Sequence, residues 1–313
     1  MLDFCAKQKK FKQCGDLMRL FNSYHPYAML SVVFWSLAFV LTRLTLQYFS
    51  AFSIGFLRYF IAACIFAAMV FWGKIKRPNK ADFKYFLFSG FFGFFFYMIA
   101  FNKGLETLTS AAGSVIIAIV PVITAIMARV VYKEKLHIIQ WAAIAVEFSG
   151  VIVLTMMNDA LSFNRGIIWM LLAAFSFAVY NILQRKLTKT YSGLQSSAYG
   201  IFIGTAMLAV FLPASLYELP SATPLALIYV AILGIFSSAV AFATWAQAFK
   251  KAEKSSQVSN YMFVTPFLAA LSGFVLAGER PDFSTITGGT IILIGMFIFN
   301  FGSELHRRIL HKV

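Results

Sequence analysis

The stretches PVITAIMARVVYKE (121–134) and PFLAALSGFVLAGE (266–279) share one arrangement, in which a proline opens an apolar run that ends in a glutamate. When the chain is shifted against itself by 145 residues, without a gap, further positions fall into register. The matched pairs are Ser110 with Ser255, Ser114 with Ser259, Pro121 with Pro266, Glu134 with Glu279 and Gly150 with Gly295. An ordered set of this length indicates that the chain contains a duplicated unit. A weaker match, Trp35-Ser-Leu-Ala38 with Phe175-Ser-Phe-Ala178 at a shift of 140, extends the unit towards its first helix.

The composition places this duplicated unit in a membrane. Of 313 residues, 60% are hydrophobic and only 12% are charged, against roughly 25% charged in an average soluble domain. A bilayer core about 30 Å thick needs roughly 20 apolar residues per helix. The sequence predicts ten such helices, at 27–46, 52–72, 83–101, 110–131, 138–156, 166–187, 194–213, 225–248, 255–277 and 284–302. We therefore expect an all-α polytopic membrane protein.

The basic residues predict the orientation of the chain. With the N-terminus in the cytoplasm, 22 of the 27 Lys and Arg residues fall in cytoplasmic segments, and Arg43, Lys103, Arg165 and Arg280 fall on the opposite side. This positive-inside bias predicts that both termini are cytoplasmic. The expected location is the plasma (bacterial inner) membrane. The net charge of +15 is then explained by topology and by contact with anionic lipid, and not by nucleic-acid binding.

The two units are expected to be inverted, because an odd number of five helices makes the second unit enter the membrane from the opposite face. Corresponding loops exchange their charge accordingly: 247–254 is more basic than 102–109, and 132–137 is more basic than 277–282. Inverted repeats are a construction of secondary transporters. The expected organisation is a basic tail at 1–25, repeat 1 at 26–157, repeat 2 at 158–303 and a basic tail at 304–313. The first tail is interpreted either as an amphipathic helix on the inner leaflet or as a mobile tail.

Pro121 and Pro266 fall about halfway along their predicted helices. Proline has no N–H and clashes with the carbonyl four residues earlier. A carbonyl freed at mid-membrane depth should face protein or water, which marks both helices as walls of a cavity. A kink that serves packing alone is the alternative. Glu134 and Glu279, at the ends of these helices, are interpreted as interfacial ion pairs or as caps on a neighbouring loop.

The repeated Pro-to-Glu runs, together with Trp35-Ser-Leu-Ala-Phe in helix one and Leu57-Arg58-Tyr-Phe in helix two, resemble the drug/metabolite transporter superfamily, specifically its EamA-type ten-helix members. The resemblance covers about 27 to 302. It implies a central cavity lined mainly by helices one, three and four of each repeat, with helices five and ten peripheral. Four-helix multidrug relatives carry a proton-binding glutamate in helix one. Helices one and six of this chain contain no carboxylate, so that coupling mechanism is not carried over.

Polar and aromatic side chains deep in the implied lining helices are the candidate substrate-binding residues. Amides and aromatic rings suit a neutral, zwitterionic or amphipathic solute, although polar side chains also hold membrane helices together. The candidates are Trp35, Tyr97, Asn102, Asn181, Gln184, Trp245, Gln247, Asn260 and Tyr261.

Four further residues are candidates for gating or coupling: Arg58, Glu147, Pro121 and Pro266. An unpaired cation inside a membrane is costly, so Arg58 is interpreted either as a structural clamp or as a substrate or gating contact. Glu147 lies near the middle of helix five. It is interpreted either as a neutral packing residue or as a protonatable coupling group.

Enzyme chemistry is not expected. The five aspartates lie in tails or loops, the four histidines lie at span ends or in a tail, and the sequence contains neither H-E-x-x-H nor G-x-S-x-G. No phosphate loop, metal-binding spacing, cofactor motif or catalytic residue is predicted. We expect a secondary active transporter of a small organic metabolite, with export slightly favoured over uptake and a channel ranked third. Its expected partners are the solute and membrane lipid. The sequence does not decide whether a proton is coupled to transport. A monomer is sufficient, because one chain suffices for a complete cavity, and a dimer is the alternative.

Overall fold

The computed structural model describes residues 23–134, 136–156, 165–280 and 283–310, and the regular structure of these residues is entirely helical. Ten successive helical spans confirm the predicted fold class. In chain order they are α2 (His25–Thr45); α3 (Ala51–Phe71); η1 (Lys80–Asp82), α4 (Phe83–Gly90), η2 (Phe91–Phe96) and α5 (Tyr97–Leu105); α6 (Ser110–Ile117) and α7 (Val120–Tyr132); α8 (Ile138–Met156); α9 (Arg165–Leu187); α10 (Gly193–Leu208), η3 (Ala209–Phe211), α11 (Leu212–Glu218) and η4 (Leu219–Ser221); α12 (Pro224–Ile232), η5 (Leu233–Val240) and α13 (Ala241–Lys251); α14 (Ser255–Ser259), η6 (Asn260–Val264) and α15 (Thr265–Ala277); and α16 (Phe283–Leu310).

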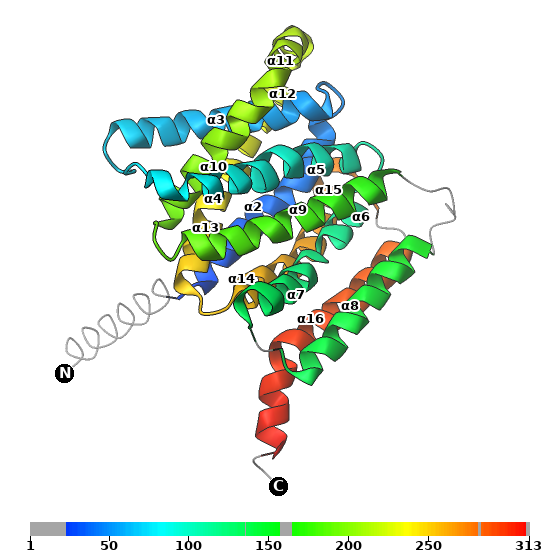
Figure 1. The fold of residues 1–313 in the computed structure, drawn as a ribbon. Helices are drawn as coiled ribbons and strands as arrows, with labels where there is room; N and C mark the ends of the chain where they lie inside the picture. Colours follow the sequence, from blue (N-terminus) through cyan, green and yellow to red (C-terminus); the bar gives the residue numbers. More distant parts are fainter. Residues whose placement is uncertain (1–22, 135, 157–164, 281–282, 311–313) are drawn as a thin grey trace, which may run out of the picture.

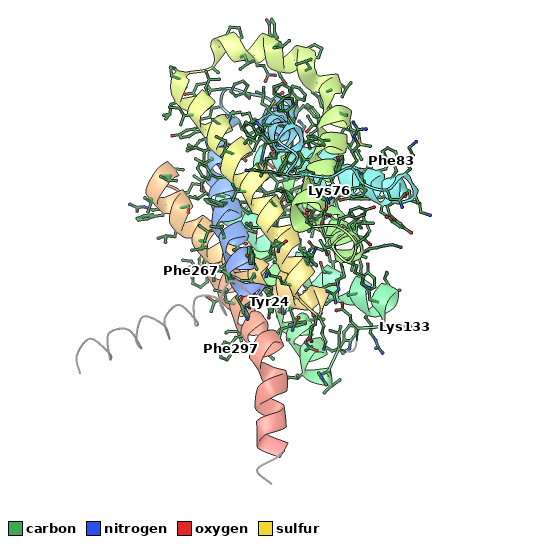
Figure 2. All side chains as sticks on the ribbon, turned by 90° about the vertical axis from the view of Figure 1, so that its left-hand side faces the viewer. Tyr24, Lys76, Phe83, Lys133, Phe267 and Phe297 are labelled. Carbon is green, nitrogen blue, oxygen red and sulfur yellow. The ribbon has the colours of Figure 1, made fainter. Side chains whose placement is uncertain are left out.

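These spans have the length and surface of membrane helices. Eight of them, within the described part of the chain, are long and apolar enough to cross a bilayer, and shorter apolar segments lie within α8 and α16. Large apolar side chains face outwards: Phe267 and Phe297 are 61% and 60% exposed, and Figure 2 shows both at the periphery of the bundle. The chain is therefore an integral membrane protein. The predicted N-terminal tail lies almost wholly outside the described residues, whereas α16 continues through Leu310, beyond its predicted end at 302.

The spans pack in pairs that repeat between the two halves. Span 3 packs on span 6 through α5 and α9, and span 8 packs on span 1 through α13 and α2. Likewise α7 of span 4 packs on α9, and α15 of span 9 packs on α2. The fifth and tenth spans, α8 and α16, pack side by side at one end of the bundle (Figure 1). Exchanging spans 1–5 with spans 6–10 leaves this set of contacts unchanged, as expected for two repeats related by a twofold axis.

Local irregularities repeat as well. π-helical segments begin at Phe91 in span 3 and at Leu233 in span 8, a shift of 142 residues. The helices of spans 4 and 9 end in left-handed residues at Lys133 (φ 54°) and Gly278 (φ 63°), a shift of 145 residues. The two shifts differ because 22 residues separate the start of the π segment from the start of the next span in the second repeat (233 to 255), against 19 in the first (91 to 110).

Both proline-containing spans are broken immediately before their proline. α6 ends at Ile117, and α7 restarts at Val120 with Pro121 as its second residue. In span 9, the 3-10 segment η6 separates α14 from α15, whose second residue is Pro266. Proline fits the first turn of a helix because the N–H groups there have no partner within the helix. The predicted kinks are thus helix breaks in the middle of the membrane.

Candidate substrate site

Four aromatic side chains from both halves of the chain meet at the centre of the bundle, and we call them the central aromatic cluster. They are Trp35 of α2, Phe177 of α9, and Phe242 and Trp245 of α13. The Trp35 ring lies 5.2 Å from Phe177, 5.1 Å from Phe242 and 4.9 Å from Trp245, in edge-to-face geometry. Such arrangements place the positive edge of one ring against the negative face of another. The cluster is a contiguous aromatic surface at the seam between the repeats.

The polar atoms of the two tryptophans are tied to neighbouring spans. Trp245 Nε1 donates to Asn181 Oδ1 at 2.9 Å, and Asn181 Nδ2 donates to Thr124 Oγ1 at 3.2 Å. Thr124 lies in α7, three residues after Pro121, so this chain of bonds connects spans 4, 6 and 8. Asn181, Trp245 and Thr124 are completely buried. The predicted lining residues Asn181 and Trp245 thus act as one hydrogen-bonded unit beside the helix break of span 4.

The π-helical segments supply backbone carbonyls to side chains of the opposite repeat. Trp35 Nε1 donates to the carbonyl of Ser237 in η5 at 3.0 Å. Ser176 Oγ of α9 donates to the carbonyl of Phe92 in η2 at 2.7 Å. A π-helical turn disturbs the regular backbone ladder and is a frequent feature of functional sites. Each π segment therefore fixes the first span of the other repeat against its own span.

Of the other predicted lining residues, Tyr97 is part of the centre, whereas two amides serve as ties between helices. The Tyr97 ring lies 5.0 Å from Phe177, and the residue retains intermediate exposure. Asn102 Nδ2 donates to the carbonyl of Ala51 at 2.7 Å, at the start of α3. Gln184 Oε1 accepts from Ser196 Oγ at 2.6 Å and links α9 to α10.

The remaining three candidates lie apart from the aromatic cluster. Tyr261 Oη makes a short hydrogen bond to His25 Nδ1, and its ring lies 6.3 Å from that of Tyr24, which Figure 2 marks at the start of α2. Gln247 packs its backbone against Gly193. Asn260 is buried in η6, in the break of span 9.

Glu147 lies in the contact between α8 and α16, away from the central aromatic cluster. The residue is 2% exposed, and neither carboxylate oxygen has a hydrogen-bond partner. A Cβ atom at Gly295 of α16 would lie 2.5 Å from Glu147 Cγ, so the two helices approach closely at this point. This placement agrees with the packing interpretation of Glu147.

Glu279 closes one end of the bundle by bridging the two halves. Its carboxylate accepts from Ser110 N at 3.0 Å and from Ser110 Oγ at 3.2 Å, and it pairs with Arg43 Nε at 3.0 Å. Arg43 Nη1 also donates to the carbonyl of Leu108 at 2.5 Å. A carboxylate at a helix N-terminus accepts N–H groups that otherwise have no partner and interacts favourably with the helix dipole. We call these residues the Glu279 latch.

Glu134 makes the corresponding contact at the other end. Its Oε1 atom accepts from Ser255 N and from Ser255 Oγ, both at 3.1 Å. Arg185 donates a short hydrogen bond to the carbonyl of Ala252, as Arg43 does to Leu108. We call these four residues the Glu134 latch. Both glutamates are therefore caps, and each one caps a helix of the opposite repeat. Glu279 also forms an ion pair with Arg43, so both interpretations hold for that residue.

The two latches lie at opposite faces of the membrane. Span 4 crosses the bilayer once, with Ser110 at its start and Glu134 just after its end. Ser110 belongs to the Glu279 latch and Glu134 belongs to the other latch, so one span connects them. The signal for this pairing was present in the sequence, because both serines and both glutamates match at the shift of 145 residues. Sequence reasoning missed that the partners cross between repeats.

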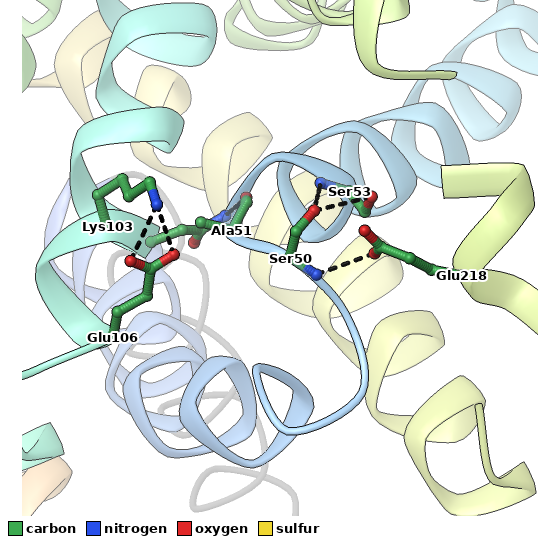
Figure 3. A network of polar contacts seen from close by, with 7 residues as sticks. Ser50, Ala51, Ser53, Lys103, Glu106 and Glu218 are labelled. Atoms are coloured by element: carbon green, nitrogen blue, oxygen red, sulfur yellow. Dashed lines mark hydrogen bonds and ion pairs between the residues drawn. The ribbon is translucent and has the colours of Figure 1, made fainter. Parts of the chain in front are cut away.

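Further polar contacts fix the connections between spans. Ser50 N donates to Glu218 Oε2 at 2.9 Å, and Lys103 pairs with Glu106 at 2.9 Å (Figure 3). The glutamate contact joins the start of α3 to the end of α11. The Lys103–Glu106 pair lies within one turn at the end of α5 and does not itself join two spans.

Tyr191 holds another connection, between α9 and α10. Its Oη atom donates to Asp82 Oδ2 at 2.6 Å and accepts from Asn79 N at 3.1 Å. Burial and the hydrogen bond to Asp82 raise the pKa of Tyr191, so the phenol remains protonated and continues to donate. This contact ties the second repeat to the start of span 3.

Ten membrane spans in two matching halves, joined by a polar and aromatic centre, are the architecture of a membrane transporter for small molecules, and the family confirms this class. The chain belongs to the EamA-like transporter family, whose sequence pattern matches residues 22–156 and again residues 164–301.

Several transporters are similar to this chain over most of its length. An uncharacterised transporter of Archaeoglobus fulgidus is 27% identical, over 86% of this chain and 95% of its own. A probable terminal-alkyne amino-acid exporter of Streptantibioticus cattleyicolor is 26% identical, over 87% and 91%. An S-adenosylmethionine uptake transporter of Rickettsia prowazekii is 26% identical, over 89% and 92%. A crystal structure with 19% identity superposes with a TM-score of 0.68, over 91% of this chain and 98% of the other, and shows the same fold.

Proposed function

We propose that this protein is a secondary active carrier that moves a small organic metabolite across the plasma (bacterial inner) membrane by alternating access, with both termini in the cytoplasm. Residues 26–157 and 158–303 are its two inverted repeats. Export is slightly favoured over uptake. The similar proteins support a metabolite as cargo, since one is named for an amino acid and another for S-adenosylmethionine, which itself contains an amino-acid group.

The observation that carries this proposal is the central aromatic cluster with its bond to Asn181. The cluster is built by both repeats and is tied to span 4 close to the break before Pro121. A movement of either half therefore changes the spacing of the rings. Aromatic faces and amides suit a neutral, zwitterionic or amphipathic solute. The proposed lining is Trp35, Tyr97, Asn181 and Trp245, with Asn102, Gln184, Gln247, Asn260 and Tyr261 contributing nearer the ends of the path.

The two latches supply the gates. The contacts of both latches are formed in this structure. Alternating access requires that one latch opens while the other stays closed. Each glutamate makes charge-assisted hydrogen bonds, which contribute about 1.5–3 kcal/mol when they involve a charged group. Contacts of this strength hold a gate shut and are still weak enough for a bound solute to shift the balance.

The proposal is tested by a transport assay with metabolite profiling. Purified protein is reconstituted into liposomes that contain a mixture of amino acids, sugars and cationic drugs, and the external solution is analysed over time. Saturable, protein-dependent loss of one solute class is the expected result. Vesicles that release every solute as slowly as empty liposomes would contradict the proposal.

Two rival functions have distinct signatures in the same vesicles. An uptake carrier accumulates its solute when right-side-out cells are supplied with it, whereas an exporter lowers the internal concentration. A channel gives single-vesicle currents far above carrier turnover and shows no counterflow. Accelerated exchange of labelled solute by unlabelled solute on the opposite side is the expected result for a carrier.

A further inference from the structure

Arg58 is a buried guanidinium whose hydrogen-bonding capacity is only partly used. It lies in α3 and is 2% exposed. Its Nε atom donates to Ser238 Oγ at 3.1 Å, while Nη1 is buried without a hydrogen-bond partner. Among the described residues, no carboxylate forms an ion pair with it. A membrane interior makes such an uncompensated cation costly, and residues of this kind mark binding sites and pathways.

Among the described residues, Ser238 Oγ accepts a hydrogen bond from this guanidinium, and a buried phenol without a partner lies beside it. The Arg58 Cζ atom lies 5.7 Å from the centre of the Tyr59 ring. Tyr59 is completely buried, and its Oη atom has no hydrogen-bond partner. A structural clamp would direct these donors at backbone carbonyls, as Asn102 does at Ala51. Arg58 Nη1 and Tyr59 Oη instead leave two buried donors without an acceptor.

The same region adjoins the central aromatic cluster. Arg58 binds Ser238, and Trp35 binds the carbonyl of Ser237, so successive residues of η5 hold the guanidinium and the indole. The Tyr59 ring lies 6.1 Å from Phe242 of the cluster. A molecule resting on the aromatic rings could therefore place a charged group near Arg58.

We propose that Arg58 and Tyr59 bind the carboxylate of the transported solute, while the central aromatic cluster contacts the rest of the molecule. This inference rests on the proposed transport function and specifies its cargo as a monocarboxylate, such as an amino acid. A carboxylate offers two acceptor oxygens, which match a guanidinium N–H and a phenol O–H. One cation balances one negative charge, so a phosphate with two charges fits this site less well.

The experiment compares each carboxylate with its neutral amide. Proteoliposomes are assayed for transport of leucine and leucinamide, phenylalanine and phenylalaninamide, and butyrate and butyramide. The wild type is expected to transport the acid of at least one pair about tenfold better than the amide, the factor that one charge-assisted contact supplies. Transport of amides at the same rates as acids would overturn the carboxylate proposal and leave the transport function intact. A lack of any transport would overturn the transport function itself.

Variants then test the two named residues. Arg58→Gln is expected to abolish the preference for acids over amides, and Arg58→Lys to retain part of it. Tyr59→Phe keeps the ring and removes one donor, so it is expected to raise KM for acids about threefold to tenfold without changing KM for amides. Tyr217→Phe, at a residue that is 85% exposed on α11, is the matched control and is expected to change neither value.

Binding is measured separately, because Arg58→Gln could fail to fold. Detergent-solubilised wild type and Tyr59→Phe are heated with increasing concentrations of each acid or amide. The acids are expected to raise the melting temperature of the wild type at lower concentrations than they do for Tyr59→Phe. If Arg58→Gln does not fold and Tyr59→Phe equals the wild type in both binding and KM, Arg58 is a structural clamp and the proposal is wrong.

Discussion

Trp245, at the centre of the bundle, must both pack as an aromatic ring and satisfy a buried N–H group. Its side chain is fully buried, its ring packs on Trp35, and its indole N–H is satisfied by Asn181. A buried N–H without an acceptor would cost about 1–3 kcal/mol. Position 245 therefore needs an aromatic donor, and position 181 needs an acceptor that also reaches Thr124.

The proposed lining predicts a large loss of transport when three of its members are removed together. Trp35→Ala, Asn181→Ala and Trp245→Ala in one chain should reduce the initial rate at least about 100-fold, because ring contacts and the amide disappear at once. Initial rates in proteoliposomes measure the effect. Since truncating a buried aromatic residue costs about 3–5 kcal/mol of stability, size-exclusion profiles must accompany the rates.

Two control variants keep this prediction interpretable. Trp72→Ala removes an indole that is 69% exposed, and it should leave the rate unchanged. Trp245→Phe keeps a ring in the centre and removes only the hydrogen bond to Asn181, so it should fold and transport more slowly than the wild type. A triple variant that transports at the rate of the wild type would contradict the lining.

Glu147 supports a prediction about coupling. Its carboxyl group lies between α8 and α16, with no polar partner and no contact with the aromatic cluster, so Glu147→Gln should preserve packing at nearly the same volume. We expect transport within about twofold of the wild type and an unchanged response when a proton gradient is collapsed. Transport by Glu147→Gln that no longer responds to the gradient would instead identify this residue as the coupling site.

At the residue scale, the sequence predicted the polar members of the centre better than the apolar ones. Asn181, Trp35 and Trp245 stood out because amides and indoles are unusual in an apolar span. Phe177 and Phe242 did not, since a phenylalanine towards lipid and one towards the centre have the same chemistry. Membrane helices are apolar on every face, so hydrophobicity does not reveal which way a residue points. The sequence also did not reveal that Asn102 and Gln184 hydrogen-bond between helices.

Spans 4 and 9 are each built from short helices separated by a break. Their breaks were predictable because proline has no N–H to donate to the carbonyl four residues earlier. The 3-10 form of η6, in contrast with the simple break after α6, was not predictable, since the sequence carries the same proline at both sites. The latches that end these spans depend on contacts between residues at least 65 positions apart, which no local pattern encodes.

The latches predict opposite responses to two matched variants. Glu279→Gln should loosen the face that contains Ser110, and Glu134→Gln the face that contains Ser255, because each change removes the charge from the helix cap. A loss of about 1.4 kcal/mol shifts a two-state equilibrium tenfold. The reporters are Ser114→Cys and Ser259→Cys, introduced one at a time into a chain without its native cysteines. They lie at buried and equivalent positions of the two repeats, and the rate at which each one is labelled reports how open its face is.

Labelling with a membrane-impermeant thiol reagent, applied to each side of the membrane, measures this response. Glu279→Gln should raise the labelling rate of Cys at 114 about tenfold and leave Cys at 259 unchanged or slower. Glu134→Gln should show the reverse. Equal effects of both variants on both reporters would show that the glutamates stabilise the fold and do not act as separate gates.

At the scale of the whole molecule, the inverted arrangement makes a prediction about topology. Lys103 and Lys251 end the third and eighth spans, which are equivalent in the two repeats, so inversion places them on opposite sides of the membrane. Lys103→Cys should react with an impermeant thiol reagent added outside intact cells, and Lys251→Cys only after the cells are opened. Reaction of both from the same side would disprove the inverted repeats. The fold class itself was fully predictable, since span length and charge distribution are physical requirements of the bilayer.

Each half of the chain lacks something that the other half supplies. Glu134 of the first repeat caps the helix that starts at Ser255, in the second repeat. Glu279 of the second repeat caps the helix that starts at Ser110, in the first repeat. A separately produced half would leave the first N–H groups of its fourth helix unsatisfied, beside a carboxylate with no helix to cap. The two halves, which descend from one duplicated unit, have therefore become complementary parts. A substitution of either glutamate in one half removes the cap from a helix in the other half.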